Sequence, residues 1–359
     1  MDREDRSFIL RGRGAASNHA GRFERHLREA TDDGWGGDED PLPVLRTTTR
    51  IERPRSIISY NRSPDLPFDR SINPYRGCEH GCIYCFARPS HAYLGLSPGL
   101  DFETQLIARP EAPDVLRREL AAKAYRPATL AIGTNTDPYQ PIEKEHGIMR
   151  ACLEVLREAR HPVAVVTKGS LIERDIDILS DMAADGLARV GISITTLDAR
   201  LSRLMEPRAP APARRLRIVS RLAQAGIPVR IMASPLIPVL TDPELEAILQ
   251  AGHDAGADHA SWVMLRLPRE VSPLVRDWLT QHYPGRAARI MGRLREMHGG
   301  RDYDPAWGKR MRGEGPYAQM VAARFDLALK RLGFAKAATV LRTDLFRAPG
   351  RNAAQMQLF

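Results

Sequence analysis

The sequence has few cysteines and no long hydrophobic run. No apolar stretch approaches the roughly 18 residues that a membrane span needs, and the charged N-terminus lacks the apolar segment of a signal peptide. Four cysteines occur in 359 residues, and three of them are clustered, which does not make a disulfide framework. These absences predict a cytoplasmic protein with no membrane association.

The charge is unevenly distributed along the chain, whereas a hydrophobic content of 43% is ordinary for a globular protein. Residues 266–359 carry 18 basic and 8 acidic residues, and the preceding part is nearly balanced. Such a surplus suits a surface that contacts nucleic-acid phosphates, and it suits an ordinary solvated surface equally well. If nucleic acid binds, we expect Arg310 and Arg312 to contribute to the affinity.

Three segments of the chain differ in their residue pattern. Residues 1–56 alternate charges and glycines without periodicity and predict an irregular, flexible arm. Residues 57–267 alternate short apolar runs with amphipathic helical patterns and predict a folded core. Residues 268–359 show helical patterns around a glycine-rich loop at 299–315. They predict a mostly helical, basic extension that caps the open side or the mouth of the core.

The core segment contains six apolar runs that predict buried strands, and a short strand at Ile57–Tyr60 leads into them. Helical patterns separate successive runs, which indicates a parallel β/α architecture because each crossover needs a helix. A closed eightfold barrel typically takes about 250 residues, so six units over about 200 residues predict a partial, TIM-like (β/α)6 barrel. The six expected strands are Ser71–Tyr75, Ala128–Gly133, Pro162–Thr167, Ala188–Ile194, Ile227–Met232 and His259–Leu265.

Three of the four cysteines, Cys78, Cys82 and Cys85, occur within eight residues. Their spacing places three thiols on one tight loop, where thiolates can converge on a metal centre. Closed zinc sites want four N or S ligands, and iron–sulfur clusters are usually held by four cysteines. Three thiolates therefore indicate a four-iron cluster with one open iron, or a structural zinc site with His80 as fourth ligand. The position of His80 between two cysteines and the lack of a second cysteine pair disfavour zinc.

The cysteine spacing, with Tyr84 before the last cysteine, resembles the signature of the radical S-adenosylmethionine (SAM) enzymes. Two longer stretches, Asn73–Cys85 and Gly133–Glu143, resemble the branch grouped with spore photoproduct lyase, often labelled DNA-repair-photolyase-like. The resemblance extends from about Ile57 to Leu267.

This resemblance implies a partial barrel, a [4Fe-4S] cluster held by Cys78, Cys82 and Cys85, and SAM bound at the open iron. In such enzymes an electron from a donor such as flavodoxin or ferredoxin cleaves SAM to methionine and a 5′-deoxyadenosyl radical. That radical then abstracts hydrogen from the substrate.

Chemistry in parallel β/α folds collects at the C-terminal ends of the strands. The resemblance implies that four consecutive residues after one strand, Thr134, Asn135, Thr136 and Asp137, contact the amino group of SAM. Asp137 alternatively serves as a turn residue before Pro138.

Four other residues are matched to the rest of SAM. Lys168 can reach the carboxylate, or it is a surface lysine at a strand end. Ser193 suits a ribose hydroxyl, and the backbone of Tyr84 suits the adenine. Arg208 is a second partner for an anion, or an ordinary surface arginine.

The substrate is less defined by the sequence. Spore photoproduct lyases use a cysteine as hydrogen donor, and Thr134 stands where our alignment places that cysteine. A hydroxyl cannot easily donate a hydrogen atom, so thymine-dimer repair by that route is not expected. Tyr139, Tyr303 and Tyr317 are alternative donors, whereas Cys152 lies in an apolar helical pattern typical of a core.

We expect a nucleic acid or a nucleobase lesion as the first substrate class, with lyase-like or repair-like chemistry. A small metabolite or a protein side chain comes second. One alternative is not an enzyme: a nucleic-acid-binding protein whose cysteine loop holds zinc or a cluster for structural reasons.

Overall fold

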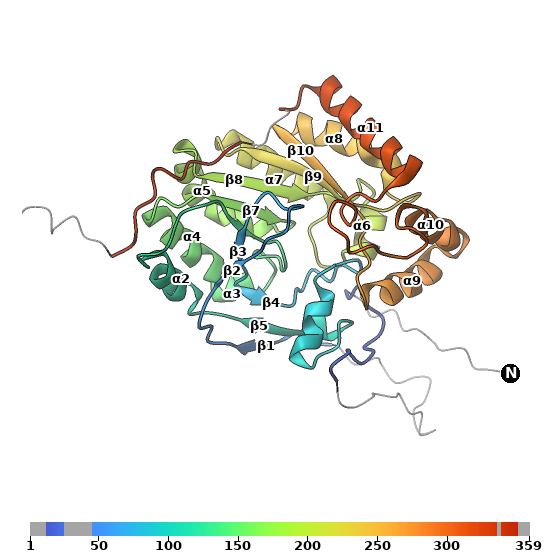
Figure 1. Ribbon diagram of the computed structural model, residues 1–359, viewed down its shortest axis with the longest axis horizontal. Helices are drawn as coiled ribbons and strands as arrows, with labels where there is room; N and C mark the ends of the chain where they lie inside the picture. The colour runs from blue at the N-terminus through green and yellow to red at the C-terminus, as the bar shows by residue number, and fades with distance from the viewer. Residues whose placement is uncertain (1–11, 25–44, 336–338, 351–359) are drawn as a thin grey trace, which may run out of the picture.

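The computed structural model describes residues 12–24, 45–335 and 339–350 (Figure 1). Six parallel strands lie side by side in chain order, and β2 (Ile58–Tyr60) pairs antiparallel with the first of them. The predicted α/β fold with a partial (β/α)6 barrel is therefore confirmed. The parallel strands are β3 (Arg70–Ile72), β6 (Leu130–Ile132), β7 (Val163–Thr167), β8 (Ala188–Ser193), β9 (Val229–Leu236) and β10 (His259–Met264).

Helices in the crossovers cover the outer side of this curved sheet (Figure 1). The longer ones bury an apolar stripe, as α4 does with Met149, Leu153 and Leu156. The longer ones are α2 (Ala112–Leu120), α4 (Ile148–Glu158), α5 (Ile176–Ala184), α7 (Pro212–Gln224) and α8 (Leu245–Asp254). The shorter ones are η1 (Arg88–Leu94), α1 (Asp101–Thr104), α3 (Glu143–His146), η2 (Ser170–Asp175), α6 (Ala199–Met205) and η3 (Asp242–Glu244).

The first expected strand is divided between two sheets. β3 ends at Ile72, and Tyr75 belongs to β4 (Tyr75–Arg76), which pairs with β5 (Gln105–Ala108). Pro74 lies between them and lacks the N–H that a continuous ladder would use. β5 also pairs with β1 (Thr48–Ile51), which falls in the segment expected to be irregular. The side chains of β1 are mostly exposed, so its sequence lacks the apolar alternation that would predict a strand.

The helical stretch between β6 and β7 is interrupted. Gly147 adopts a left-handed φ of 63° and separates α3 from α4. Downstream, the single turn η3 precedes α8.

The C-terminal segment forms α9 (Val271–His282), α10 (Pro284–Met297) and α11 (Gly315–Leu332), and α11 packs along α8 (Figure 1). Between α10 and α11 a loop reaches across the open side of the barrel. Its Met311 accepts a hydrogen bond from Met264 N in β10 (2.8 Å), and its Arg310 pairs with Asp65 in the β2–β3 loop (2.6 Å). These contacts place the loop at the open side, one of the two positions expected for this segment.

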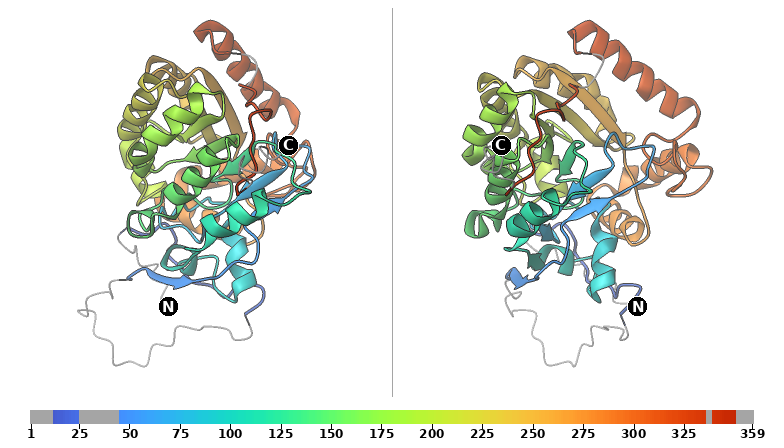
Figure 2. Two further views of the ribbon diagram at one scale, coloured as in Figure 1. Left: turned by 90° about the vertical axis from the view of Figure 1, so that its left-hand side faces the viewer. Right: turned by 60° about the vertical axis from the view of Figure 1, so that its left-hand side comes forward.

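Residues 339–350 run along the outer helices as an extended tail (Figure 2). The N–H groups of Arg342 and Arg347 donate to the carbonyls of Gly186 and Ala159. No helix in the described ranges has the length and apolar character needed to cross a membrane. The acidic stretch at residues 32–40 lies outside the described residues.

Candidate active site

The three clustered cysteines lie on the loop between β4 and η1. Gly77 and Gly81 adopt left-handed φ values of 76° and 66°, and two tight turns follow. They are closed by hydrogen bonds from Gly81 N to Cys78 O (3.3 Å) and from Cys85 N to Cys82 O (3.2 Å). All three thiols are free; Cys78 and Cys82 are buried and Cys85 is half-buried. The loop therefore presents three unpaired thiols together, as their spacing predicts.

A buried ion pair between Arg88 and Glu103 fixes the backbone of this cysteine loop. The guanidinium of Arg88, which is fully buried, donates to the carbonyls of Cys82 (3.0 Å) and Gly81 (3.3 Å). It also pairs with Glu103 Oε1 at 2.5 Å. Neither Arg88 nor Glu103 was predicted from the sequence as part of the site. The position of Arg88, three residues after the last cysteine, was the available signal, because a buried loop needs donors for its carbonyls.

The N-terminal arm docks onto the same ion pair, and we call its residues 13–23 the N-terminal strap. The N–H groups of Gly14 and Ala15 donate to the two oxygens of Glu103 (3.0 and 2.9 Å). A Cβ at Gly14 would lie 1.8 Å from Gly81 O, so the strap touches the cysteine loop directly. Figure 2 shows this segment beside η1. This part of the arm, expected to be flexible, is thus irregular in conformation but fixed by its contacts.

Burial raises the pKa of all three thiols, to about 12 for Cys82. The charge of Lys168 opposes this rise at Cys82, and that of Arg88 opposes it at Cys85. Negative charge on Cys82 or Cys85 raises the pKa of Cys78, and negative charge on Cys85 raises that of Cys82. Such thiols release their protons when they bind metal.

Three free thiols on one loop are the donor set that a four-iron cluster with one open iron requires. Within the described ranges, no three His, Cys, Asp or Glu side chains converge as ligands of a single ion would. A four-iron cluster has a different requirement, because each thiolate binds a separate iron. His80, the fourth ligand in the zinc alternative, instead places Nδ1 3.3 Å from Oδ2 of Asp137.

Asp137 connects three parts of the site. Its Oδ1 accepts hydrogen bonds from Tyr139 N (2.9 Å) and Thr167 Oγ1 (2.6 Å), and its Oδ2 accepts from Lys168 N (2.8 Å). Burial alone would raise its pKa, but His80 and these donors lower the pKa to about 2. The contact with Tyr139 N is the turn interaction named as the alternative for this residue. Both oxygens are therefore already used within the protein.

The other residues of this segment differ in availability. Thr136 is buried and donates to Tyr75 O (2.9 Å). Thr134 and Asn135 are half-buried beyond the end of β6. They are the members of the predicted group whose side chains the surrounding protein leaves available.

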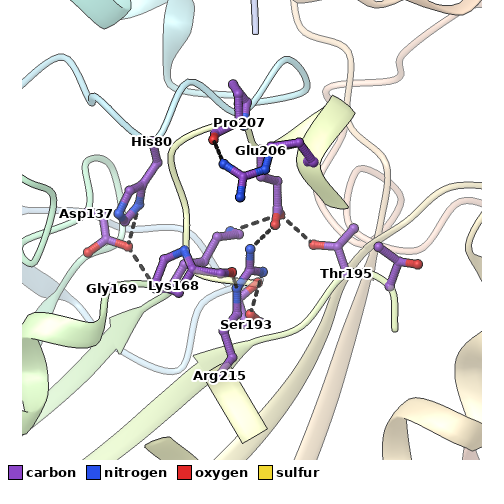
Figure 3. A network of polar contacts seen from close by, with 12 residues as sticks. His80, Asp137, Lys168, Gly169, Ser193, Thr195, Glu206, Pro207 and Arg215 are labelled. Atoms are coloured by element: carbon purple, nitrogen blue, oxygen red, sulfur yellow. Dashed lines mark hydrogen bonds and ion pairs between the residues drawn. The ribbon is translucent and has the colours of Figure 1, made fainter. Parts of the chain in front are cut away.

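A buried carboxylate, Glu206, lies at the centre of a polar network (Figure 3). Its oxygens pair with Arg215 and accept from Tyr84 Oη and from Thr195 Oγ1 (2.8 Å). Lys168 Nζ lies 4.0 Å away. The sequence analysis did not assign Glu206 or Arg215, because an acid and a base nine residues apart give no pattern.

Two cations control the ionisation of Glu206. Burial would raise its pKa, but Arg215 and Lys168 lower the pKa to about 2. Burial acts against the charged ammonium of Lys168, yet Cys82 and Glu206 outweigh that effect and raise its pKa. Lys168 also lies over the Tyr84 ring, 5.8 Å from its centroid. A permanently charged ammonium is thus held beside the cysteine loop.

Ser193 and Arg208 also contact this region. Ser193 Oγ donates to Ser234 O at the end of β9 (2.9 Å). Arg208 pairs with Glu79, which follows Cys78, at 3.1 Å, and its N–H donates to His80 O. The fold therefore brings the predicted site residues to the C-terminal ends of β6 to β8 or onto the cysteine loop, except Arg208, which follows α6 and contacts that loop.

The candidate hydrogen donors have different surroundings. Cys152 is fully buried in α4, which confirms its expected place in the core. Tyr139 is also buried, and Tyr317 Oη donates to Asp242 (2.8 Å). Tyr303 accepts from Arg266 Nη2 (3.2 Å), and the same guanidinium lies 4.6 Å from the ring centroid of Phe86, which follows Cys85. Tyr303 is thus connected to the cysteine loop through the side chain of Arg266.

Sequence comparisons match this architecture. The family model of the radical SAM superfamily matches residues 72–251. An uncharacterised protein of Mycobacterium tuberculosis is 35% identical over 235 residues, which cover 65% of this chain and 68% of the relative. An uncharacterised protein of Methanocaldococcus jannaschii is 27% identical over 214 residues, 59% of this chain and 76% of the relative.

Solved structures of spore photoproduct lyase have a similar fold. The complex of that enzyme with a dinucleoside spore photoproduct superimposes with a TM-score of 0.57 at 16% identity, covering 84% of this chain and 85% of that one. A variant with bound SAM and the dinucleoside product gives 0.55 at 15% identity, covering 79% and 78%.

Proposed function

The chain belongs to the radical SAM superfamily and is an enzyme of that class, and we propose that Cys78, Cys82 and Cys85 hold its [4Fe-4S] cluster. The observation that carries this assignment is the set of three free thiols on one loop whose carbonyls are fixed by Arg88. The chemistry that a bound cluster supplies is one-electron reduction of SAM to methionine and a hydrogen-abstracting 5′-deoxyadenosyl radical.

The residues around the loop suit the polar groups of SAM. Lys168 offers a charged ammonium whose nearest carboxylate oxygen is 4.0 Å away, so it retains hydrogen-bonding capacity for the SAM carboxylate. Thr134 and Asn135 offer side-chain oxygens to its amino group. Asp137, already saturated, acts on SAM indirectly by fixing His80 and the backbone of Lys168.

Three further contacts complete the proposed SAM site. Ser193 faces the ribose hydroxyls, and the Tyr84 backbone supports the adenine. Arg208 fixes the loop through Glu79 and contributes positive charge for the carboxylate. The buried network around Glu206 keeps Tyr84 and Lys168 in place.

We propose nucleic acid as the substrate class, with abstraction of hydrogen from a nucleobase or sugar. Two observations support it: the basic C-terminal third, and the resemblance in fold to a lyase whose solved complex holds a dinucleoside photoproduct. An electron donor such as flavodoxin or ferredoxin would reduce the cluster. Free buried thiols and this chemistry suit the reducing cytoplasm.

Anaerobic reconstitution with iron and sulfide, followed by dithionite and SAM, tests the proposal. Production of 5′-deoxyadenosine is expected in the wild type and in Cys152→Ala, and not in Cys82→Ala. Cys152→Ala is the matched control because it removes a buried thiol of α4, outside the cysteine loop.

The substrate is tested in the same assay by adding undamaged and ultraviolet-irradiated DNA, RNA, or a peptide and metabolite extract. Stimulation of SAM cleavage by a nucleic acid supports the assignment. Stimulation by the extract alone contradicts the substrate class, and absence of product from a cluster-loaded wild type under every condition contradicts the cofactor assignment.

A further inference from the structure

An arginine-lined cleft of about 560 Å³ lies in the C-terminal segment, next to the end of β10. This volume is within the range of ligand-binding clefts, about 300–1,000 Å³. Four arginines from four successive segments, the β10–α9 loop, α9, α10 and the α10–α11 loop, line it together with one carboxylate and one tyrosine: Arg269, Arg276, Arg295, Arg301, Asp302 and Tyr303. None of these residues was assigned to a ligand in the sequence, except Tyr303.

The positive charge in this arginine cleft is only partly neutralised. Asp302 accepts hydrogen bonds from Arg276, Arg295 (2.8 Å) and Ser272 (2.5 Å), so one carboxylate serves two guanidinium groups. The side chains of Arg269 and Arg301 are exposed and form no ion pair with the described part of the chain. The cleft therefore retains a surplus of positive charge at its rim.

The backbone conformation of Arg269 indicates that its side chain is held at a particular position. Its φ is 54°, in the left-handed region that residues other than glycine rarely adopt. Residues held in this way cluster at ligand-binding positions. The turn places an unpaired arginine at the rim, directly after β10.

The cleft is connected to the cysteine loop. Tyr303 on its wall accepts a hydrogen bond from Arg266 Nη2 (3.2 Å), and the guanidinium of Arg266 lies 4.6 Å from the ring centroid of Phe86. Phe86 directly follows Cys85. The cleft wall is thus linked to the cysteine loop through Tyr303, Arg266 and Phe86.

The arginines expected from the sequence to contact nucleic acid have other roles. Arg310 is engaged with Asp65 and Ser63, and Arg312 lies over the Trp262 ring, 5.1 Å from its centroid. Arg310 is therefore neutralised within the protein, whereas Arg312 is exposed and forms no ion pair with the described residues.

We propose that the arginine cleft binds the phosphate groups of a nucleic-acid strand and holds that strand beside the mouth of the barrel. This inference rests on the proposed function, because it specifies how the same substrate is held. A strand fits better than a single phosphate, since exposed arginines from separate elements line an open rim along which a chain of phosphates can run.

The experiment measures binding of a fluorescently labelled single-stranded oligonucleotide to the full-length, cluster-loaded protein by anisotropy at several salt concentrations. The double variant Arg269→Gln/Arg301→Gln is expected to bind about tenfold more weakly. The slope of log K against log salt should become shallower by about 1.4, since each lost phosphate contact on a single strand contributes about 0.7.

The matched control is Arg217→Gln/Arg289→Gln, which removes two exposed arginines outside the cleft on α7 and α10. It should bind as the wild type does. A variant with the opposite expected effect is Asp302→Asn, which frees Arg276 and Arg295 from their shared carboxylate and should tighten binding several-fold. Unchanged binding in the cleft double variant, or an equal loss in the control, would overturn the proposal.

Inorganic phosphate and a nucleoside monophosphate are added as competitors. Displacement of the oligonucleotide by either at micromolar concentration would show a site for small phosphate esters and would contradict the strand. Suppose that the oligonucleotide binds through Arg269 and Arg301 but does not stimulate SAM cleavage. That result would support the cleft as a binding site and contradict nucleic acid as the substrate. Suppose instead that nucleic acid stimulates SAM cleavage but the double variant binds it as the wild type does. That result would support nucleic acid as the substrate and contradict the cleft as its binding site.

Discussion

At the scale of single residues, the ion pair between Glu206 and Arg215 supports the candidate site most directly. Both side chains are fully buried, and Glu206 also orients Tyr84 and faces Lys168. Removing one partner of a buried pair typically costs about 3–5 kcal/mol, because the remaining charge is left without compensation. The pair therefore fixes Tyr84 and Lys168, which are assigned to SAM, but substitution of either Glu206 or Arg215 alone should strongly destabilise the protein.

The pH dependence of stability should reveal this carboxylate. Its folded pKa of about 2 lies below the usual 4.5, so the folded state binds fewer protons than the unfolded state. The stabilisation is full above about pH 4.5 and is lost as the pH falls through about 2. Anaerobic urea unfolding should show the wild type losing about 1 kcal/mol more than Glu206→Gln between pH 7 and pH 4.

The control for this measurement is Glu154→Gln, which removes an exposed carboxylate that faces Arg150 on α4. It should leave both the stability at pH 7 and its pH dependence nearly unchanged. An identical pH dependence in wild type and Glu206→Gln would show that this carboxylate is not held in its charged form.

At the scale of elements, the N-terminal strap and the cysteine loop form one unit. Glu103 connects them, since it accepts from the strap amides and from Arg88, which binds the loop carbonyls. Two glycines permit the close approach: a Cβ at Gly14 would lie 1.8 Å from Gly81 O, and a Cβ at Gly99 would lie 2.2 Å from Ser17 O.

The substitution Gly14→Val should displace the strap from the loop, because the added side chain has no room. We expect amides 14 and 15 to lose protection from hydrogen exchange. Absorbance of the reconstituted cluster should bleach several-fold faster in air than in the wild type. Ala16→Val adds similar volume at an exposed neighbouring position and should change neither property. Exchange without faster bleaching would mean that the strap does not shield the cluster.

At the scale of the whole molecule, the C-terminal segment completes a barrel that its six strands leave open. The loop at 306–312 bonds to the edge strand β10 and, through Arg310, to the β2–β3 loop. Residues more than 240 positions apart in the chain thereby meet across the open side.

The substitution Arg310→Gln should open this closure without affecting nucleic-acid binding. Hydrogen exchange is expected to rise together at residues 61–69 and 306–312, because the two loops share the same contacts. Oligonucleotide affinity should remain within about twofold of the wild type. Arg342→Gln, whose ion pair with Asp344 is local, is the control. A rise confined to one loop, or a large loss of affinity, would contradict this division of roles.

Local pattern determined much of this molecule. The apolar runs and the helical periodicity between them predicted six parallel strands, because each signal depends on neighbours within one element. The spacing of Cys78, Cys82 and Cys85 likewise predicted three thiols on one loop, since a few residues of backbone limit where their side chains can lie.

Tertiary structure decided the parts that depend on contacts between distant residues. The pairing of Glu206 with Arg215, the docking of Gly14 on the cysteine loop and the closure by Arg310 leave no periodic trace in the sequence. The sequence also does not show which C-terminal arginines form ion pairs and which remain unpaired. That depends on where carboxylates such as Asp65 and Asp302 lie in space. Charge can be counted from a sequence, but whether a charge is neutralised is decided only when the chain has folded.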